Sequence, residues 1–178
     1  MTIVDIEQRI RALDRKVYAV FSQHGSEPKA KDVAAFESKV GLALPQQFCD
    51  FAIHPLGGLY VEVKEELWPR PHEFDVGPAW RFHYGLRVYG LSADAPEWLS
   101  MQKAWTDLQQ QGYPAFVPFL KVESDPDPYC FAKDDQIIIW RHETPDEPES
   151  FDGDFFDALL HELDALEERK IRFLAGKP

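Results

Sequence analysis

Two short apolar runs joined by a very short connection constrain the fold of this chain more than any other feature of its sequence. The runs Tyr129–Phe131 and Ile137–Trp140 are rich in aromatic and β-branched residues, which favour strands. Only five residues separate them, and Asp134 and Asp135 within this connection favour a tight turn. Parallel neighbours need a crossover of about a dozen residues or more, so the two runs are expected to pair as an antiparallel hairpin.

The second run of this hairpin also predicts where its strand lies in the sheet. Alternation along a strand sends Ile138 and Trp140 to one face and Ile137 and Ile139 to the other. Apolar side chains on both faces indicate a strand inside the sheet that other elements cover on each side. We therefore predict that Trp140 is a structural core residue without a catalytic role.

The spacing of apolar residues predicts helices at both ends of the chain. Apolar side chains three and four residues apart from Ile6 to Phe21 predict an amphipathic N-terminal helix within residues 1–25, and a similar stripe predicts a closing helix. Two shorter helices, within residues 33–40 and from Pro45 to Ala52, follow the first, and the strand patterns after them are interrupted by one more helix with Trp98 and Leu108 on its apolar face. This order predicts an α+β fold, with an antiparallel sheet of about four to six strands packed against N-terminal and C-terminal helices in a single domain, 1–178.

The acidic residues are concentrated in one part of the chain. The formal net charge is −12, yet residues 123–168 alone hold 16 acidic and two basic side chains, a net of −14. A solvated acidic face is the ordinary explanation, but a field of this size on a folded scaffold attracts basic proteins and repels nucleic acid and anionic membranes. The carboxylates predicted to contact a partner are Asp125, Asp127, Asp134, Asp135, Asp146, Glu147 and Glu149.

The sequence lacks the motifs of the common catalytic and cofactor sites. It contains neither a Gly-x-Ser-x-Gly nucleophile elbow nor the glycine patterns that bind phosphates and dinucleotides. The six histidines are scattered singly, and Cys49 and Cys130 lie in apolar stretches without metal-ligand spacing. We therefore expect no catalytic residues, cofactor or metal. Without a signal-peptide pattern or an apolar run long enough to span a bilayer, the expected location is the cytoplasm.

An insert at residues 64–83 interrupts the strand pattern and leaves three interpretations open. It is rich in proline, and residues 68–84 combine five aromatic side chains with Arg70, His72, Arg81 and His83. The favoured interpretation is that these aromatic groups fold back and plug the core of the protein, since a long connection needs contacts to hold it down. A groove for a partner protein is a second, and a nucleotide-binding enzyme that uses the aromatic groups is a third.

Several segments taken in order resemble the SUKH superfamily. Residues 33–58 contain Phe-Glu, a glycine four residues further on, Leu-Pro, two phenylalanines and Gly-Gly. The runs 117–120, 130–131 and 138–143 resemble the central hairpin of the family, and 151–160 resembles its closing helix. The resemblance implies caps, turns and packing roles for the family's structural signature, which here comprises Glu37, Gly41, Pro45, Gly57 and Gly58.

The resemblance also implies a function. Members of the superfamily serve mostly as bacterial immunity proteins, which bind and neutralise a toxin without catalysis of their own. An acidic inhibitor suits a toxin with a basic cleft, such as a nuclease domain, because opposite charges accelerate association. The alternative is a regulatory module that binds an endogenous protein. The oligomeric state stays open.

Overall fold

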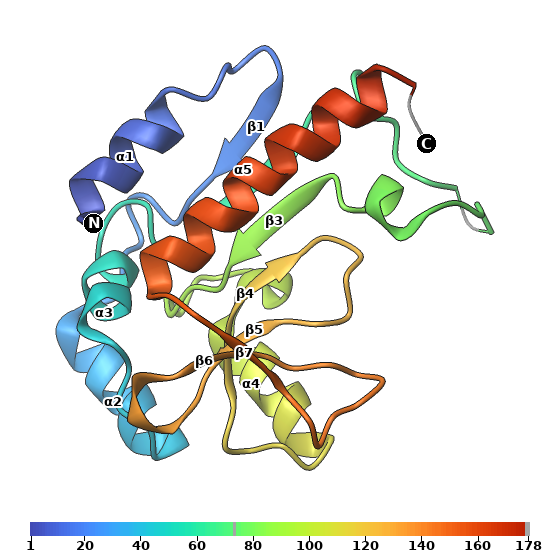
Figure 1. Ribbon diagram of the computed structural model, residues 1–178. Helices are drawn as coiled ribbons and strands as arrows, with labels where there is room; N and C mark the ends of the chain where they lie inside the picture. Colours follow the sequence, from blue (N-terminus) through green and yellow to red (C-terminus); the bar gives the residue numbers. More distant parts are fainter. Residues whose placement is uncertain (73, 177–178) are drawn as a thin grey trace.

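The sheet of this protein has its strands in sequence order. The structure, a computed structural model, describes residues 1–72 and 74–176. Within these residues seven strands form one open antiparallel sheet in the order β1 to β7, joined by five α-helices and three short 3₁₀ helices (Figure 1). The strands are β1 Tyr18–Phe21, β2 Tyr60–Val63, β3 Gly85–Val88, β4 Val117–Val122, β5 Tyr129–Phe131, β6 Ile137–Ile139 and β7 Glu149–Phe151.

Most of the helices lie before β2 or between β3 and β4, and the longest one closes the chain. The α-helices are α1 Ile3–Arg11, α2 Ala30–Val40, α3 Gln46–Ala52, α4 Met101–Gln110 and α5 Phe155–Leu174, and the 3₁₀ helices are η1 Ala79–Phe82, η2 Glu97–Leu99 and η3 Lys133–Asp135. The fold is therefore α+β, as the sequence predicts, and the β5–β6 hairpin is antiparallel. The strand count exceeds the predicted four to six because both edge strands, β1 and β7, escape the sequence patterns.

The N-terminal helix is much shorter than the sequence predicts. It ends at Arg11, and a turn at Asp14 follows, in which the Asp14 carbonyl accepts from the amides of Val17 and Tyr18. The chain then pairs with β2 as strand β1, so the predicted helix over 1–25 is wrong beyond its first half. Val17, Val20 and Phe21 match the helical spacing by coincidence. Their β-branched and aromatic side chains favour the strand once β2 offers a pairing edge.

Helices cover both faces of the sheet. The sheet therefore lies between two apolar clusters. Helix α5 crosses one face in Figure 1, and its Phe155 packs edge-on against Phe48 of α3 and Phe51, with ring centroids 5.3 Å and 5.1 Å away. On the opposite face Leu108 of α4 packs in a second cluster with residues of β5 and β6. Ile137 belongs to the first cluster and Ile138 to the second, as the predicted alternation requires.

Trp140 lies immediately after β6 and belongs to the second cluster. Its side chain is 5% exposed and contacts the apolar side chains under α4. The amide of Trp140 donates to the Pro128 carbonyl at 3.0 Å, which extends the β5–β6 ladder by one residue. Burial against α4 therefore holds this ring in the interior of the protein.

The residues of the predicted structural signature lie at helix ends and turns. Gly41 ends α2 with a left-handed φ of 71°, and Pro45 immediately precedes α3. The Glu37 carboxylate accepts a hydrogen bond from the Leu44 amide at 2.8 Å, which ties α2 to the start of α3. Gly57 and Gly58 are buried, and a Cβ on Gly57 would lie 2.4 Å from the Ala52 carbonyl oxygen.

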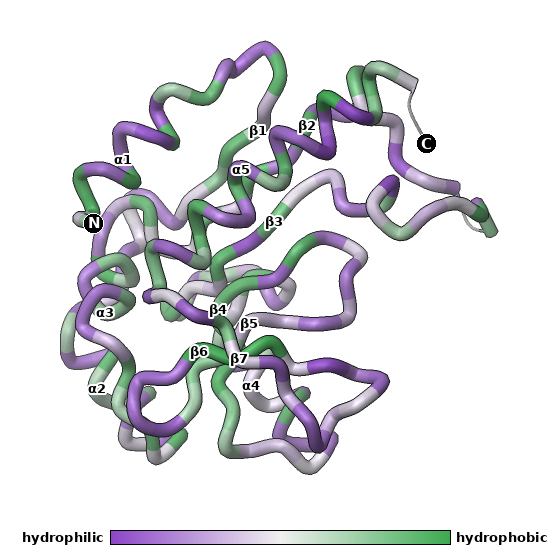
Figure 2. Tube along the Cα trace, in the orientation of Figure 1, coloured by the Kyte–Doolittle hydropathy of each residue, from purple (hydrophilic) through white to green (hydrophobic). Residues whose placement is uncertain are grey.

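The sheet has two unlike ends, which position the candidate site. The insert and the β4–β5 and β6–β7 loops emerge together at the right of Figure 1, whereas the β5–β6 turn lies at the opposite end. We call the first of these the loop end, made of residues 64–72, 74–83, 123–128 and 141–149. Figure 2 shows that its loops are mostly hydrophilic, in contrast to the hydrophobic strands behind them.

Candidate partner-binding surface

The seven carboxylates predicted to contact a partner lie at both ends of the sheet. Asp134 and Asp135 are exposed in η3, at the β5–β6 turn. The paired segments 128–132 and 136–140 separate that turn from the loop end, and five residues at about 3.3 Å each span about 17 Å. The seven carboxylates are close together in the sequence because strands β5 and β6, which separate the two groups, are only three residues long each. The carboxylates at the loop end are Asp125, Asp127, Asp146, Glu147 and Glu149.

Asp127 is engaged by its own protein rather than open to a partner. Its side chain is only 13% exposed, and it accepts from Arg141 Nη1 at 3.1 Å and from the His142 backbone amide at 3.0 Å. His142 Nδ1 also lies 2.7 Å from the carboxylate. Burial raises the pKa of Asp127, but the hydrogen bonds from His142 and Arg141 outweigh it, so the pKa lies below its usual value. Asp127 therefore fixes the two neighbouring loops.

Arg141 closes the acidic β6–β7 loop at its base. Its guanidinium pairs with Asp127 on one side and with Glu149 at the start of β7 on the other, with Nε donating to Glu149 at 3.1 Å. The loop between Arg141 and Glu149 contains turns in which the Thr144 amide donates to the Arg141 carbonyl and the Glu147 amide donates to the Thr144 carbonyl. This fixed loop displays the exposed carboxylates of Glu143, Asp146 and Glu147.

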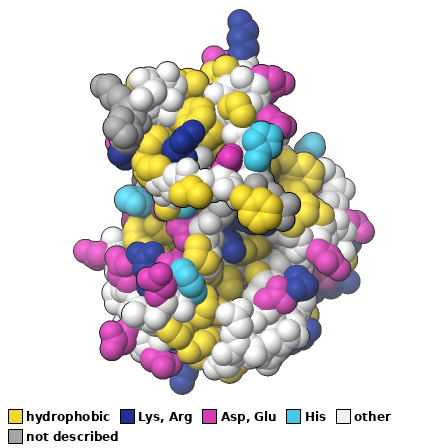
Figure 3. Space-filling view, turned by 90° about the vertical axis from the view of Figure 1, so that its right-hand side faces the viewer, with side chains coloured by type: hydrophobic (Ala, Val, Ile, Leu, Met, Phe, Trp, Pro, Cys, Tyr) yellow, Lys and Arg dark blue, Asp and Glu magenta, His cyan; other side chains and the backbone are white. Residues whose placement is uncertain are grey.

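The start of the insert is packed into the protein, and its tip is not. Trp68 is fully buried, stacks on Phe173 of α5 with ring centroids 4.5 Å apart, and donates from Nε1 to the Arg81 carbonyl at 3.0 Å. Phe74 and Val76 at the tip are 88% and 95% exposed. The prediction that the aromatic groups of the insert plug the core therefore holds for Trp68 but not for Phe74 at the tip. Figure 3 faces the loop end and shows the insert above a hollow in the surface.

Of the two histidines of the nucleotide-binding alternative, only His72 lines the cavity at the insert. His72 lines a cavity of about 280 Å³ under the insert, together with Arg70, Arg81 and Asp75. His83 is half-buried outside that lining, and burial lowers its pKa while Asp125 partly offsets this effect. Arg70 is already occupied by the Glu62 carboxylate at 2.6 Å and by two carbonyls.

A buried polar network behind the loop end is absent from the sequence-based predictions. The hydroxyl of Tyr129 on β5 donates to Glu162 of α5 at 2.7 Å, and Arg169 Nη1 donates to the same carboxylate at 3.3 Å. Glu162 is 7% exposed, and burial together with this carboxylate raises the pKa of Tyr129. One feature of the sequence could have indicated this network: Glu162 is a charged residue next to Leu163 on the otherwise apolar face of α5.

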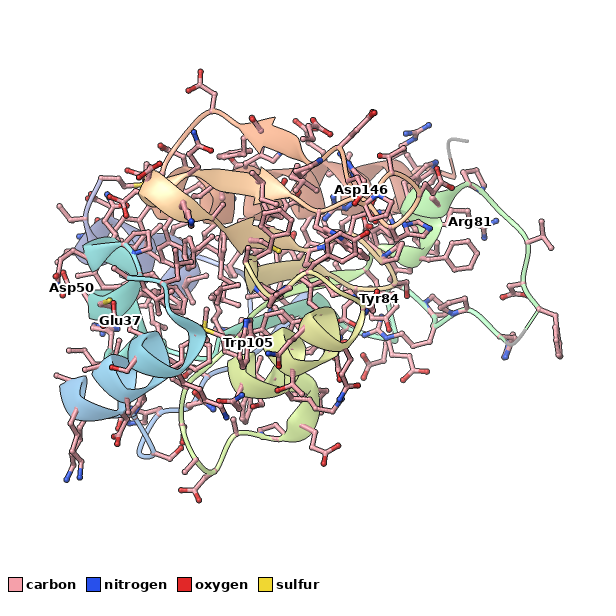
Figure 4. All side chains as sticks on the ribbon, turned by 90° about the horizontal axis from the view of Figure 1, so that it is seen from below. Glu37, Asp50, Arg81, Tyr84, Trp105 and Asp146 are labelled. Atoms are coloured by element: carbon pink, nitrogen blue, oxygen red, sulfur yellow. The ribbon has the colours of Figure 1, made fainter. Side chains whose placement is uncertain are left out.

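The views of the molecule agree on which residues share an end. Figure 4, seen from below, places Asp146, Arg81 and Tyr84 at one end of the sheet, and Glu37 and Asp50 at the other. Trp105 of α4 lies between these ends, where its ring contacts Phe36 of α2 at 6.5 Å between centroids. The insert and the acidic β6–β7 loop therefore face the same side of the molecule.

Comparisons of the sequence with known protein families and with curated proteins find no match. Among residues 1–72 and 74–176, no three His, Cys, Asp or Glu side chains come together as metal ligands. Over the same residues, no helix combines the length and the apolar character needed to cross a membrane.

Proposed function

We propose that this chain is a non-catalytic immunity protein that binds and neutralises a cognate bacterial toxin through the acidic loops of its loop end. The SUKH-like order of motifs in the sequence supports the class of function. The fixed loop between Arg141 and Glu149 supports the surface, and it is the observation that carries the proposal.

A loop held in one conformation binds with a smaller entropic cost than a mobile one. Arg141 bridges Asp127 and Glu149, so Asp146 and Glu147 project from a loop whose base is already closed. Preorganisation of this kind raises affinity, and exposed carboxylates accelerate encounter with a basic partner. A toxin that acts on nucleic acid has such a basic cleft, which makes a nuclease domain the expected partner.

The test compares two double variants that remove the same charge from opposite ends of the sheet. We expect a toxin gene directly upstream of the gene for this chain, and the probe is an inactivated form of the domain that this gene encodes. We expect Asp146→Asn/Glu147→Gln to slow association about tenfold at low salt and much less at physiological salt, because screening weakens the attraction. The matched control is Asp134→Asn/Asp135→Asn. Asparagine tolerates the positive φ of both positions, 60° and 56°.

The control decides whether the contact is local. Equal slowing by both pairs would mean that only the net charge matters, and unchanged association in both would remove the acidic loops from the interface. If the wild-type protein does not bind this domain at all, the proposal fails, and the regulatory-module alternative takes its place.

A further inference from the structure

An aromatic cluster on the sheet belongs to neither apolar core. Helix α4 covers the sheet at β4 to β6 but leaves the same face of β1 to β3 open, where Phe21 and Trp98 are each 45% exposed. The register places Phe21 opposite Tyr60 and Tyr60 opposite Arg87. Trp98 of η2 packs on this row, with its ring 5.2 Å from Tyr60 and 6.2 Å from Phe21. We call Phe21, Tyr60, Arg87 and Trp98 the aromatic platform.

The polar groups around the platform satisfy one another. Arg87 lies with its guanidinium 5.4 Å from the Trp98 ring, donates to the Trp98 carbonyl at 2.7 Å and pairs with Glu123. The hydroxyl of Tyr60 donates to Glu62 at 2.7 Å, and Glu62 pairs with Arg70 of the insert. The rings are therefore held in place, and Tyr60 and Arg87 keep their hydrogen bonds when a partner covers the platform.

Rings of this kind, with arginine, are the residues that most often dominate binding energy. Anchors of protein interfaces are enriched in Trp, Tyr and Arg at the centre of a patch, with a polar rim around them. Here the basic charge of Arg87 is neutralised by Glu123, while Asp94 and Glu97, close to Trp98 in sequence, are exposed. Lys121 continues the row opposite Arg87, so the acidic side of the platform is the side of η2, at Asp94 and Glu97. An aromatic centre with this acidic side complements an apolar pocket bordered by lysine or arginine.

The platform is continuous with the acidic loop end. Glu123, the partner of Arg87, directly follows β4 and begins the β4–β5 loop, which carries Asp125. A standard protein interface covers about 800 Å² on each partner, or a patch roughly 30 Å across. One partner of ordinary size can therefore contact the platform and the acidic loops together.

We propose that the aromatic platform anchors the toxin, by entering an apolar pocket with a basic border, and sets the dissociation rate, while the acidic loops contact the toxin at the rim and set the association rate. This inference rests on the proposed function, since the partner is the same. It separates two kinetic roles. Desolvated anchors set the dissociation rate with little salt dependence, whereas exposed charges at the rim set the association rate.

The experiment measures both rates for the same toxin domain. We expect Trp98→Ala to raise the dissociation rate about 30-fold or more, the change expected for an anchor, and to leave the association rate and its salt dependence unchanged. Trp98→Phe keeps an aromatic ring and should recover most of the effect. The matched control is Val4→Ala, which shortens an apolar side chain 53% exposed on α1.

A second variant protects the test against loss of folding. If Trp98→Ala lowers the melting temperature enough to obscure binding, Phe21→Ser probes the same platform from the edge strand. Unchanged dissociation rates in a folded platform variant overturn this inference and leave the proposed function intact. Absence of wild-type binding overturns both. A wild-type dimer in the ultracentrifuge that Trp98→Ala dissociates, with toxin kinetics unchanged, would instead make the platform a contact between two copies of this chain.

Discussion

Replacing Trp140 by alanine tests whether the second apolar cluster stabilises the fold. The ring is 5% exposed and packs with Leu108 of α4 and with Ile138 and Cys130 of the central hairpin. Tyr113 lies over it, with ring centroids 5.5 Å apart. These contacts join α4 to the sheet, so a truncated side chain leaves a cavity between two layers.

Two opposing effects set the size of the change. Truncation of a buried tryptophan to alanine costs about 3–5 kcal/mol. The indole Nε1 of Trp140 is buried without a hydrogen-bond acceptor, however, and the variant removes this penalty of about 1–3 kcal/mol. We therefore expect a net loss of about 2 kcal/mol. For a chain of this length, that is a fall in melting temperature of roughly 4–8 °C.

The assay is urea and thermal unfolding followed by circular dichroism, which does not depend on the deleted fluorophore. Trp140→Phe is the matched variant, because it keeps most of the apolar contacts and removes the unpaired donor. Its stability should lie within about 1 kcal/mol of the wild type. The folded fraction of Trp140→Ala should still bind toxin. A variant with the wild-type melting temperature that fails to bind would refute the reasoning and make Trp140 a contact residue.

Three further outcomes follow from individual contacts. Because its hydrogen bonds depress the pKa of Asp127 below 3.8, ionised Asp127 stabilises the fold above about pH 4, and this contribution disappears as the pH falls through the lowered value. Asp127→Asn should therefore be less stable than the wild type at neutral pH in urea unfolding, with the difference shrinking in acid. Gly57→Ala should cost about 1–3 kcal/mol through the clash with the Ala52 carbonyl, more than Gly77→Ala, whose Cβ meets no atom closer than the Arg81 side chain at 3.4 Å; chemical denaturation of both variants checks the order. Burial raises the pKa of the Cys49 thiol to about 11, so at neutral pH it should react far more slowly with a disulfide reagent than free cysteine; a matching rate would contradict the burial.

Local patterns in the sequence predict the centre of this fold better than its edges. The β5–β6 hairpin, the alternation through Ile137 and Ile138 and the closing helix α5 all follow from spacing alone. The edge strands do not, because each pairs on one side only and has little apolar periodicity of its own. β1 has the apolar spacing of a helix and becomes a strand only through β2, while β7 is a short, mostly exposed segment that ends the sheet.

The candidate site also has features that the sequence predicts and features that depend on the fold. The acidic composition of residues 123–168 and the presence of the β5–β6 hairpin within them follow from the sequence. The folded chain alone shows that Asp134 and Asp135 lie at one end of the sheet and Asp146 at the other, that Arg141 pairs with Asp127, and that Trp98 contacts Phe21. The difference lies in how far apart in sequence the interacting residues are. Periodicity and turn chemistry act over a few residues, whereas ion pairs and ring contacts join residues tens of positions apart and depend on how the strands are paired.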